Sequence, residues 1–243
     1  MKNGFSGFSP EGIAFLRDLK RNNDREWFTP RKQVFEERVR LPMIELVRAI
    51  HAEMLRFAPD YVGDAAKSVF RIYRDTRFSK NKTPYKTHVA ASFRHARAGK
   101  AHSGFYFSVS PEEIEIGGGL YRPEPNALLA VRQRIADRHG DFRKTFEPLK
   151  IRKLMGELYG ESAARAPKGF DPKHPAIELL KRKQYCLFVT LDAAIGTTPK
   201  LFGEIVKRFE AITPFVNFLN APHLNAPHMG SERGRDFEDD PKH

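Results

Sequence analysis

The sequence predicts a single α+β domain with an N-terminal helical layer, a central, mainly antiparallel sheet, and C-terminal helices packed on that sheet. Apolar residues recur at helical spacing through the first sixty residues and again after residue 125. Between residues 68 and 120 apolar residues instead recur at every second position, which is typical of strands. Strands in one central block with helices before and after it favour an α+β domain, and 243 residues are enough to bury its core.

The first sixty residues contain clear helix-start signals. Ser9 before Pro10 favours a helix start, because the serine hydroxyl can cap a free amide and proline fits the first helical position. Asn22-Asn23-Asp24 should end the first helix and can cap the next short turn, and Thr29-Pro30 repeats the first signal at the start of a longer helix. Pro42 should start or kink the next segment. The side chains expected to face inward from these helices are Val34, Phe35, Val39, Leu41, Leu46, Val47, Ile50 and Leu55.

The central block divides into short alternating segments that are separated by turn residues, which predicts an antiparallel meander. We expect strands at Val69–Phe78, Val89–His95, Gly104–Val109 and Glu113–Gly117, with Gly117-Gly-Gly119 ending the last one. The elements expected after the meander are a helix to about Arg138, a short helix from Asp141, a strand at Tyr185–Leu191 and a closing helix at Pro199–Leu219.

The chain is strongly basic, with a formal net charge of +12 and a pI near 9.8. This charge favours contact with polyanions, phosphate-bearing ligands or an acidic partner, although simple solubility is the alternative. Residues 221–243 carry three Lys or Arg and five acidic residues, a net −2, so that residues 1–220 carry +14. Because this stretch is almost devoid of apolar residues, we expect a domain over residues 1–220 and a disordered, charged tail over residues 221–243.

The sequence lacks the residue patterns that several kinds of functional site require. The one cysteine, Cys186, excludes an internal disulfide and a cysteine-cluster metal site, and its apolar neighbours predict a buried, inert thiol. The nine histidines show no metal-ligand spacing, and there is no nucleophile elbow, P-loop or dinucleotide fingerprint. We therefore expect no metal and no cofactor. No apolar stretch approaches the length of about 18 residues that a membrane helix needs, and the cysteine usage fits the cytoplasm.

The most unusual segment is residues 71–88, which contain three arginines and three lysines but a single acid, Asp75. In a strand, side chains point alternately to opposite faces. One face of this segment would therefore carry Arg71, Tyr73, Asp75 and Arg77. One carboxylate cannot neutralise all of the neighbouring cations, so the segment keeps a positive surplus.

This surplus predicts a binding site for a phosphate-bearing or other anionic ligand, either nucleic acid or a nucleotide-like molecule. Arginine offers a planar fork for phosphate or carboxylate, and lysine offers a point charge. The glycines before Arg122 could present further backbone amides to an anion. The residues expected to bind the ligand are Arg71, Tyr73, Arg74, Asp75, Arg77, Lys82, Tyr85, Lys86 and Arg122.

Two alternatives stay open. The chain could be an enzyme acting on an anionic substrate, with Asp75 as general base and the arginines stabilising developing charge. Nearby cations should lower the pKa of Asp75, however, which makes it a poor base at neutral pH. The other alternative is a structural or partner-binding protein in which these charges form an internal ion-pair network, because buried charges must be paired.

The same segment carries the motif Arg71-x-x-Arg74-Asp75-x-Arg77-Phe78-x-x-Asn81-Lys82-x-x-Tyr85. This motif resembles the hallmark of a conserved-hypothetical family called domain of unknown function 2461. The other segments that resemble the family are Phe15-Leu16-x-x-Leu19-x-x-Asn22-Asn23-x-x-x-Trp27-Phe28, Gly118-Gly119 with Arg122-Pro123-Glu124, and Pro167-Lys168-Gly169-Phe170 with His174-Pro175. The resemblance covers roughly residues 5–220 and implies no particular reaction.

Overall fold

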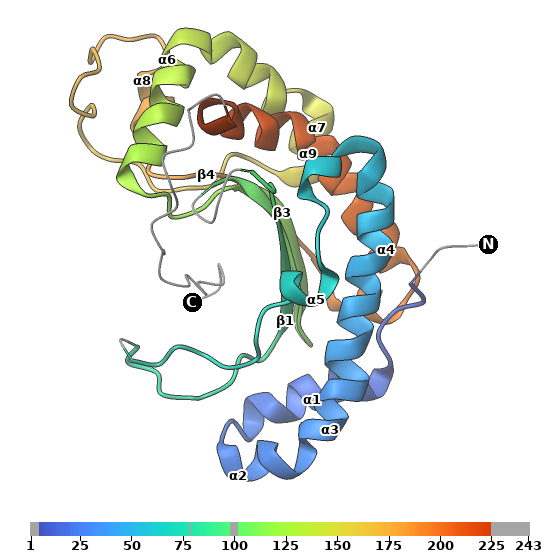
Figure 1. Ribbon diagram of the computed structural model, residues 1–243. Helices are drawn as coiled ribbons and strands as arrows, with labels where there is room; N and C mark the ends of the chain where they lie inside the picture. The colour runs from blue at the N-terminus through green and yellow to red at the C-terminus, as the bar shows by residue number, and fades with distance from the viewer. Residues whose placement is uncertain (1–4, 78, 98–101, 225–243) are drawn as a thin grey trace.

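The structure is a computed structural model that describes residues 5–77, 79–97 and 102–224, and it has the α+β architecture that the sequence predicts (Figure 1). The helices are α1 (Pro10–Arg21), α2 (Arg25–Phe28), α3 (Lys32–Phe35), α4 (Leu41–Phe57), α5 (Ala65–Ser68), α6 (Pro125–Phe146), α7 (Leu149–Met155), α8 (Ile177–Leu180) and α9 (Lys200–Leu224). The strands are β1 (Val89–Arg94), β2 (Gly104–Val109), β3 (Glu113–Leu120) and β4 (Tyr185–Asp192). Short 3-10 turns lie at Thr29–Arg31, Pro59–Tyr61 and Ala193–Thr197, and a π-helical turn lies at Glu36–Arg40.

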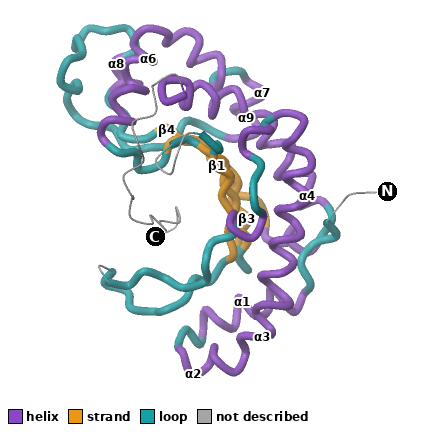
Figure 2. Tube along the Cα trace, viewed as in Figure 1, coloured by secondary structure: helices purple, strands orange, loops and turns teal. Residues whose placement is uncertain are grey.

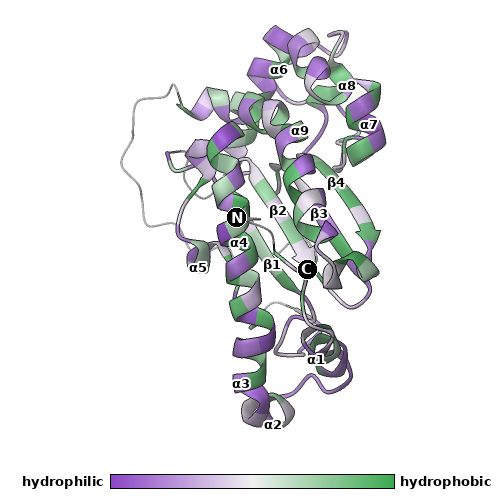
Figure 3. Ribbon diagram, turned by 90° about the vertical axis from the view of Figure 1, so that its right-hand side faces the viewer, coloured by the Kyte–Doolittle hydropathy of each residue, from purple (hydrophilic) through white to green (hydrophobic). Residues whose placement is uncertain are grey.

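The four strands form one antiparallel sheet in the order β1-β2-β3-β4, and α4 and α9 cover one face of it (Figure 1). Phe209 of α9 lies at the centre of this packing. Its ring centroid is 5.2 Å from that of Phe93, 4.9 Å from Phe105 and 6.5 Å from Phe107. In Figure 3 the strands are coloured mainly as hydrophobic residues, whereas the helices mix hydrophobic and hydrophilic positions. The sheet therefore shares its apolar core with α4 and α9.

Two of the predicted helix-start signals are confirmed by their hydrogen bonds. Ser9 Oγ accepts from the amide of Gly12 at 3.1 Å, and Asp24 Oδ1 accepts from the amide of Trp27 at 2.8 Å. Thr29-Pro30 behaves differently, because it forms a 3-10 turn inside a helical run that continues from α2 into α4.

Three side chains that were predicted to face inward project into solvent. Val34 is 43% exposed, Leu41 is 49% exposed and Leu55 is 61% exposed. Side chains four positions apart share a helix face, and a residue one position away is turned by about 100° from it. The buried stripe that follows this rule is Phe35, Val39, Met43, Leu46, Val47, Ile50 and Met54.

The strand prediction for Val69–Phe78 is wrong. The described part of this segment makes isolated antiparallel bridges, one from Val69 to Ala91 and one from Tyr73 to Tyr85. Pro84 in the returning segment has no amide hydrogen, so the ladder between the two segments is interrupted there. The predicted strand is thus part of a loop, which pairs at one position with β1 and at one position with the segment that leads into β1.

The glycines Gly117–Gly119 lie inside β3, which continues to Leu120, so the prediction that they end the strand is also wrong. Gly119 has a φ of +133°, and a Cβ atom there would lie 2.1 Å from the carbonyl oxygen of Tyr185. Glycine at this position therefore allows two neighbouring strands to approach closely.

Two differences concern helix ends. A single helix, α6, spans the two helices predicted after the meander, and non-helical dihedral angles at Arg138 (φ −132°, ψ 37°) mark the kink between them. The closing helix α9 continues to Leu224, and the rest of the predicted tail, residues 225–243, lies outside the described residues. Figure 2 shows that loops border the face of the sheet opposite α4 and α9, one formed by residues 69–88 and the other by residues 156–176.

Candidate functional site

We call residues 69–88 the basic loop; it connects α5 to β1 and is described except for residue 78. Its first part pairs with the edge of the sheet, where the Phe70 amide donates to the Ala90 carbonyl at 2.9 Å. The loop then returns alongside itself, and the Arg74 amide donates to the Pro84 carbonyl at 2.9 Å. These backbone hydrogen bonds fix the base of the loop beside β1.

The N-terminal helices hold the returning part of the basic loop. Asn23, between α1 and α2, donates from its side-chain amide to the Tyr85 carbonyl at 2.9 Å and accepts from the Tyr85 amide at 3.0 Å. The Tyr85 ring stacks on Phe28 of α2, with ring centroids 4.2 Å apart and an interplanar angle of 25°. These contacts dock the basic loop on the helical layer.

Polar side chains fix the tip of the basic loop. Asn81 Oδ1 accepts from the amide of Thr83 at 3.0 Å and from its hydroxyl at 2.9 Å. Arg74 Nη1 donates to the hydroxyl and carbonyl oxygens of Thr83, and Lys82 Nζ donates to the Thr76 carbonyl at 2.9 Å. Within the described parts of the chain, no carboxylate lies within 4.0 Å of the Arg74 or Lys82 nitrogens. Neutral oxygens therefore set the positions of both cations.

Asp75 and Arg77 form an ion pair on the outside of the basic loop. Arg77 Nη2 lies 2.6 Å from Asp75 Oδ2, and Arg77 Nε lies 3.0 Å from Oδ1. The Arg77 amide also donates to Asp75 Oδ1 at 3.1 Å. The hydrogen bonds from the Arg77 side chain and amide lower the pKa of Asp75 to about 2, so the carboxylate is ionised at neutral pH.

The exposed side of the basic loop carries the predicted row of residues. Arg71, Tyr73, Asp75 and Arg77 are exposed, whereas positions 70, 72, 74 and 76 between them are more buried. The predicted alternation is therefore present in the exposure of the side chains, although the continuous strand is not.

Two of the residues expected to bind a ligand are buried in the protein. Tyr85 is 4% exposed because its ring packs against Phe28. Lys86 is 5% exposed, and its Nζ lies 4.9 Å from the ring centroid of Phe70. Tyr85 thus positions the basic loop, and Lys86 lies at its base, beside the sheet.

Arg122 lies apart from the basic loop. It follows the end of β3 that pairs with the first residues of β2 and β4, whereas the basic loop joins the sheet at the first residues of β1. Its Cζ lies 5.4 Å from the ring centroid of Tyr121. The glycines before it pair with β2 on one side and with β4 on the other, so their amides serve the sheet.

The described ranges contain no group of metal ligands and no membrane-spanning helix. No three His, Cys, Asp or Glu side chains there are grouped so that they could hold a metal ion. Of the helices described, none combines the length and the apolar character needed to cross a bilayer. Cys186 is fully buried, and its burial raises the pKa of the thiol, which agrees with the predicted inert cysteine.

Asn23 and Phe28 have a positioning role that residue patterns in the loop itself did not indicate. Both belong to the N-terminal segment that resembles the family, and both contact Tyr85 of the central motif. A contact between residues 62 positions apart leaves no local pattern in the sequence. The signal in the sequence is that the N-terminal segment and the central motif both resemble the same family.

These features define an α+β protein in which an N-terminal helical layer presents a charged loop at the edge of an antiparallel sheet. The family model described as a conserved hypothetical protein, DUF2461, matches residues 11–218, and the chain belongs to this family. This confirms the resemblance seen in the sequence. A comparison with curated proteins finds no match.

Proposed function

We propose that this protein is a binding module for a phosphate-bearing ligand, nucleic acid or a nucleotide-like molecule, and that the basic loop is its binding site. The setting of Arg74 and Lys82 carries the proposal. Oxygens of Thr83 and Thr76 hold these cations in place without neutralising them. The neutral oxygens leave the positive charge of each side chain uncompensated, so a phosphate would gain a charge–charge attraction that these oxygens do not provide.

The exposed row supports the same site. Arg77 would contribute charge in the orientation that Asp75 gives it, Arg71 would add a second guanidinium, and Tyr73 would stack or hydrogen-bond. We leave Arg122 outside this site, because it follows the opposite end of the sheet.

The structure favours the binding module over an enzyme that uses Asp75 as its base. A general base works best when its pKa is near the operating pH. The pKa of Asp75 is lowered to about 2 by its hydrogen bonds with Arg77, and those bonds occupy both carboxylate oxygens. An ionised Asp75 carboxylate that is hydrogen-bonded to Arg77 can orient this arginine, but it is a weak base for removing a proton from a substrate.

The binding module is also favoured over an internal ion-pair network. Such a network requires buried charges that are paired with one another. The Arg77 side chain is 77% exposed, and Asp75 and Arg71 also lie at the surface. We further propose a cytoplasmic location, since the single cysteine is a buried free thiol.

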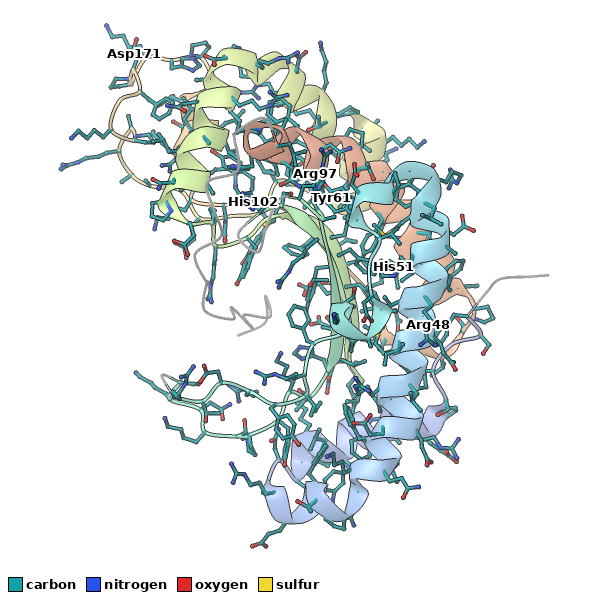
Figure 4. All side chains as sticks on the ribbon, viewed as in Figure 1. Arg48, His51, Tyr61, Arg97, His102 and Asp171 are labelled. Atoms are coloured by element: carbon teal, nitrogen blue, oxygen red, sulfur yellow. The ribbon has the colours of Figure 1, made fainter. Side chains whose placement is uncertain are left out.

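Equilibrium binding of a fluorescein-labelled oligothymidylate tests this proposal by fluorescence anisotropy. Arg74→Ala should weaken binding several-fold. The melting temperature of the protein should not change, because Arg74 bonds only within the loop. Arg48→Ala removes the same type of side chain from α4, where Arg48 lies near the N-terminal segment, and should leave binding unchanged (Figure 4). Equal affinities of the wild type and Arg74→Ala would refute the basic loop as the site.

A further inference from the structure

A row of four aromatic rings crosses the face of the sheet opposite α4 and α9. The rings of Phe70 and Tyr106 have centroids 6.2 Å apart, those of Tyr106 and Phe188 are 6.1 Å apart, and those of Phe188 and Tyr159 are 6.0 Å apart. Phe70 lies beside β1, Tyr106 lies on β2 and Phe188 on β4, and Tyr159 pairs with the outer edge of β4. We call these four residues the aromatic row; it spans the full width of the sheet.

Gly117 of β3 is what allows the row to pass over the third strand. It pairs with Tyr106 on one side and with Phe188 on the other. A Cβ atom at Gly117 would lie 2.1 Å from Cδ1 of Phe188, so the phenylalanine ring occupies the space that any other side chain would fill. The ring of Phe188 can therefore bridge from β4 towards Tyr106.

The exposed rings lie at the two ends of the aromatic row, and the most exposed ring is at the β4 end. Tyr106 is 5% exposed and forms the packed middle, Phe70 and Phe188 are partly exposed, and Tyr159 is 55% exposed. An exposed aromatic ring offers a flat apolar surface on which a nucleobase can stack.

Cations flank the aromatic row at both of its ends. At the β1 end, Phe70 belongs to the basic loop with Arg74 and Lys82. At the β4 end, Arg182 Nη1 donates to the carbonyl of Gly160, the residue after Tyr159, at 3.2 Å.

Arg132 of α6 reaches the same end of the aromatic row. Its Nη2 donates to the Arg182 carbonyl at 2.9 Å, and its buried Nε has no hydrogen-bond partner among the described residues. Within residues 5–77, 79–97 and 102–224, no carboxylate lies within 4.0 Å of the nitrogens of Arg132 or Arg182. The β4 end therefore repeats the arrangement of the basic loop, with arginines held by neutral oxygens.

The geometry points to single-stranded nucleic acid as the ligand, with its phosphates at the two cationic ends and its bases stacked on the exposed rings of the aromatic row, above all on Tyr159. This inference rests on the proposed function and narrows it. Aromatic rings next to fixed cations suit an unpaired strand, because its bases are free to stack while the cations follow its backbone. A duplex hides the faces of its bases, so it would gain nothing from the rings.

Anisotropy titrations with three probes of about twelve nucleotides test the inference, a length within the roughly 4–16 nucleotides that one OB-fold domain of a single-strand-binding protein covers. The probes are oligothymidylate, an abasic strand with the same number of phosphates, and a duplex. We expect oligothymidylate to bind more tightly than the abasic strand and the duplex. Tyr159→Ala should weaken oligothymidylate binding by about 5- to 150-fold, the range measured for the loss of one stacked base. Tyr159→Trp should retain the affinity, and Leu55→Ala on α4 serves as a control at a similarly exposed apolar side chain.

The outcomes separate the two proposals. If the abasic strand binds as tightly as oligothymidylate, or Tyr159→Ala has no effect while Arg74→Ala weakens binding, the stacking inference is overturned and the phosphate site stands. Tighter binding of the duplex also overturns it. If none of the probes binds, the nucleic-acid form of the proposed function fails together with the inference.

Discussion

Asn23 and Tyr85, 62 positions apart in the sequence, form a two-way hydrogen-bonded contact through the side-chain amide of Asn23 and the backbone of Tyr85. The side chain donates to the carbonyl and accepts from the amide, as a neighbouring strand would. Together with the stacking of Tyr85 on Phe28, this contact ties the basic loop to the N-terminal helices. The helical layer thus determines where the charges of the loop are presented.

Asn23→Ala should loosen the basic loop from the helical layer. The change removes two hydrogen bonds of roughly 1 kcal/mol each, so we expect a loss of about 2 kcal/mol in the free energy of unfolding. Urea denaturation measures this loss. Asn22→Ala is the control, because Asn22 is exposed and donates only to the Asp18 carbonyl at the end of α1, and its replacement should cost less than about 0.5 kcal/mol. Equal losses in the two variants would show that the Asn23 contact does not hold the loop.

Tyr85 should act through its ring and not through its hydroxyl. Tyr85→Phe keeps the stacking on Phe28 and should leave both the unfolding free energy and oligothymidylate affinity unchanged. Tyr85→Ala should cost about 3 kcal/mol, because it leaves a cavity against a buried aromatic ring. A Tyr85→Phe protein of normal stability but weakened binding would instead place the hydroxyl in contact with the ligand.

The Asp75–Arg77 pair should be visible in the titration of the carboxylate. Because the pKa of Asp75 is lowered in the folded protein, the pair stabilises the fold above the pKa of the unfolded chain, and this contribution is lost as the pH falls towards about 2. At pH 3 the Asp75 carboxyl should still be mostly ionised in the wild type. In Arg77→Gln its pKa should rise towards the ordinary value of about 3.9. Carboxyl carbon shifts measured by NMR follow both proteins, and identical titration curves would contradict the pairing.

Two glycine-to-alanine changes should have opposite effects on stability. Gly117→Ala places a Cβ atom 2.1 Å from Phe188 Cδ1 and 2.3 Å from the Leu187 carbonyl oxygen, so we expect a loss of at least about 2 kcal/mol. Gly140→Ala meets open space within α6 and should stabilise the protein by about 0.5–1 kcal/mol. Thermal unfolding of the two variants measures the difference. A neutral Gly117→Ala would mean that Phe188 does not lie across β3.

Much of the fold could be predicted from the sequence because local signals determine it. Ser9 and Asp24 cap the helices where the residue pattern placed them, and all four strands of the sheet begin at the predicted residues. The segment from Val69 was misread because alternation alone does not distinguish a strand from a loop that pairs at single positions. The extent of the domain, residues 1–220, stays a prediction.

The candidate site could be predicted only in part, because part of it depends on contacts between residues that are far apart in the sequence. The exposed row and the surplus of cations follow from residue types near Arg77, and the structure shows that side exposed. The burial of Tyr85 depends on its contact with Phe28, and the separation of Arg122 from the basic loop depends on the order of the strands. The aromatic row depends on the pairing of β3 with its neighbours, which no local pattern of residues indicates.

The salt dependence of oligothymidylate binding tests the central claim most directly. Each phosphate contact on a single strand contributes about −0.7 to the slope of log K against log salt concentration. Between about 50 and 200 mM salt, the slope for the wild type should be steep, and Arg74→Ala and Lys82→Ala should each make it shallower by about 0.7, while Arg48→Ala leaves it unchanged. Identical slopes for all four proteins, or an affinity of the wild type that does not change with salt, would contradict the basic loop as a phosphate-binding site.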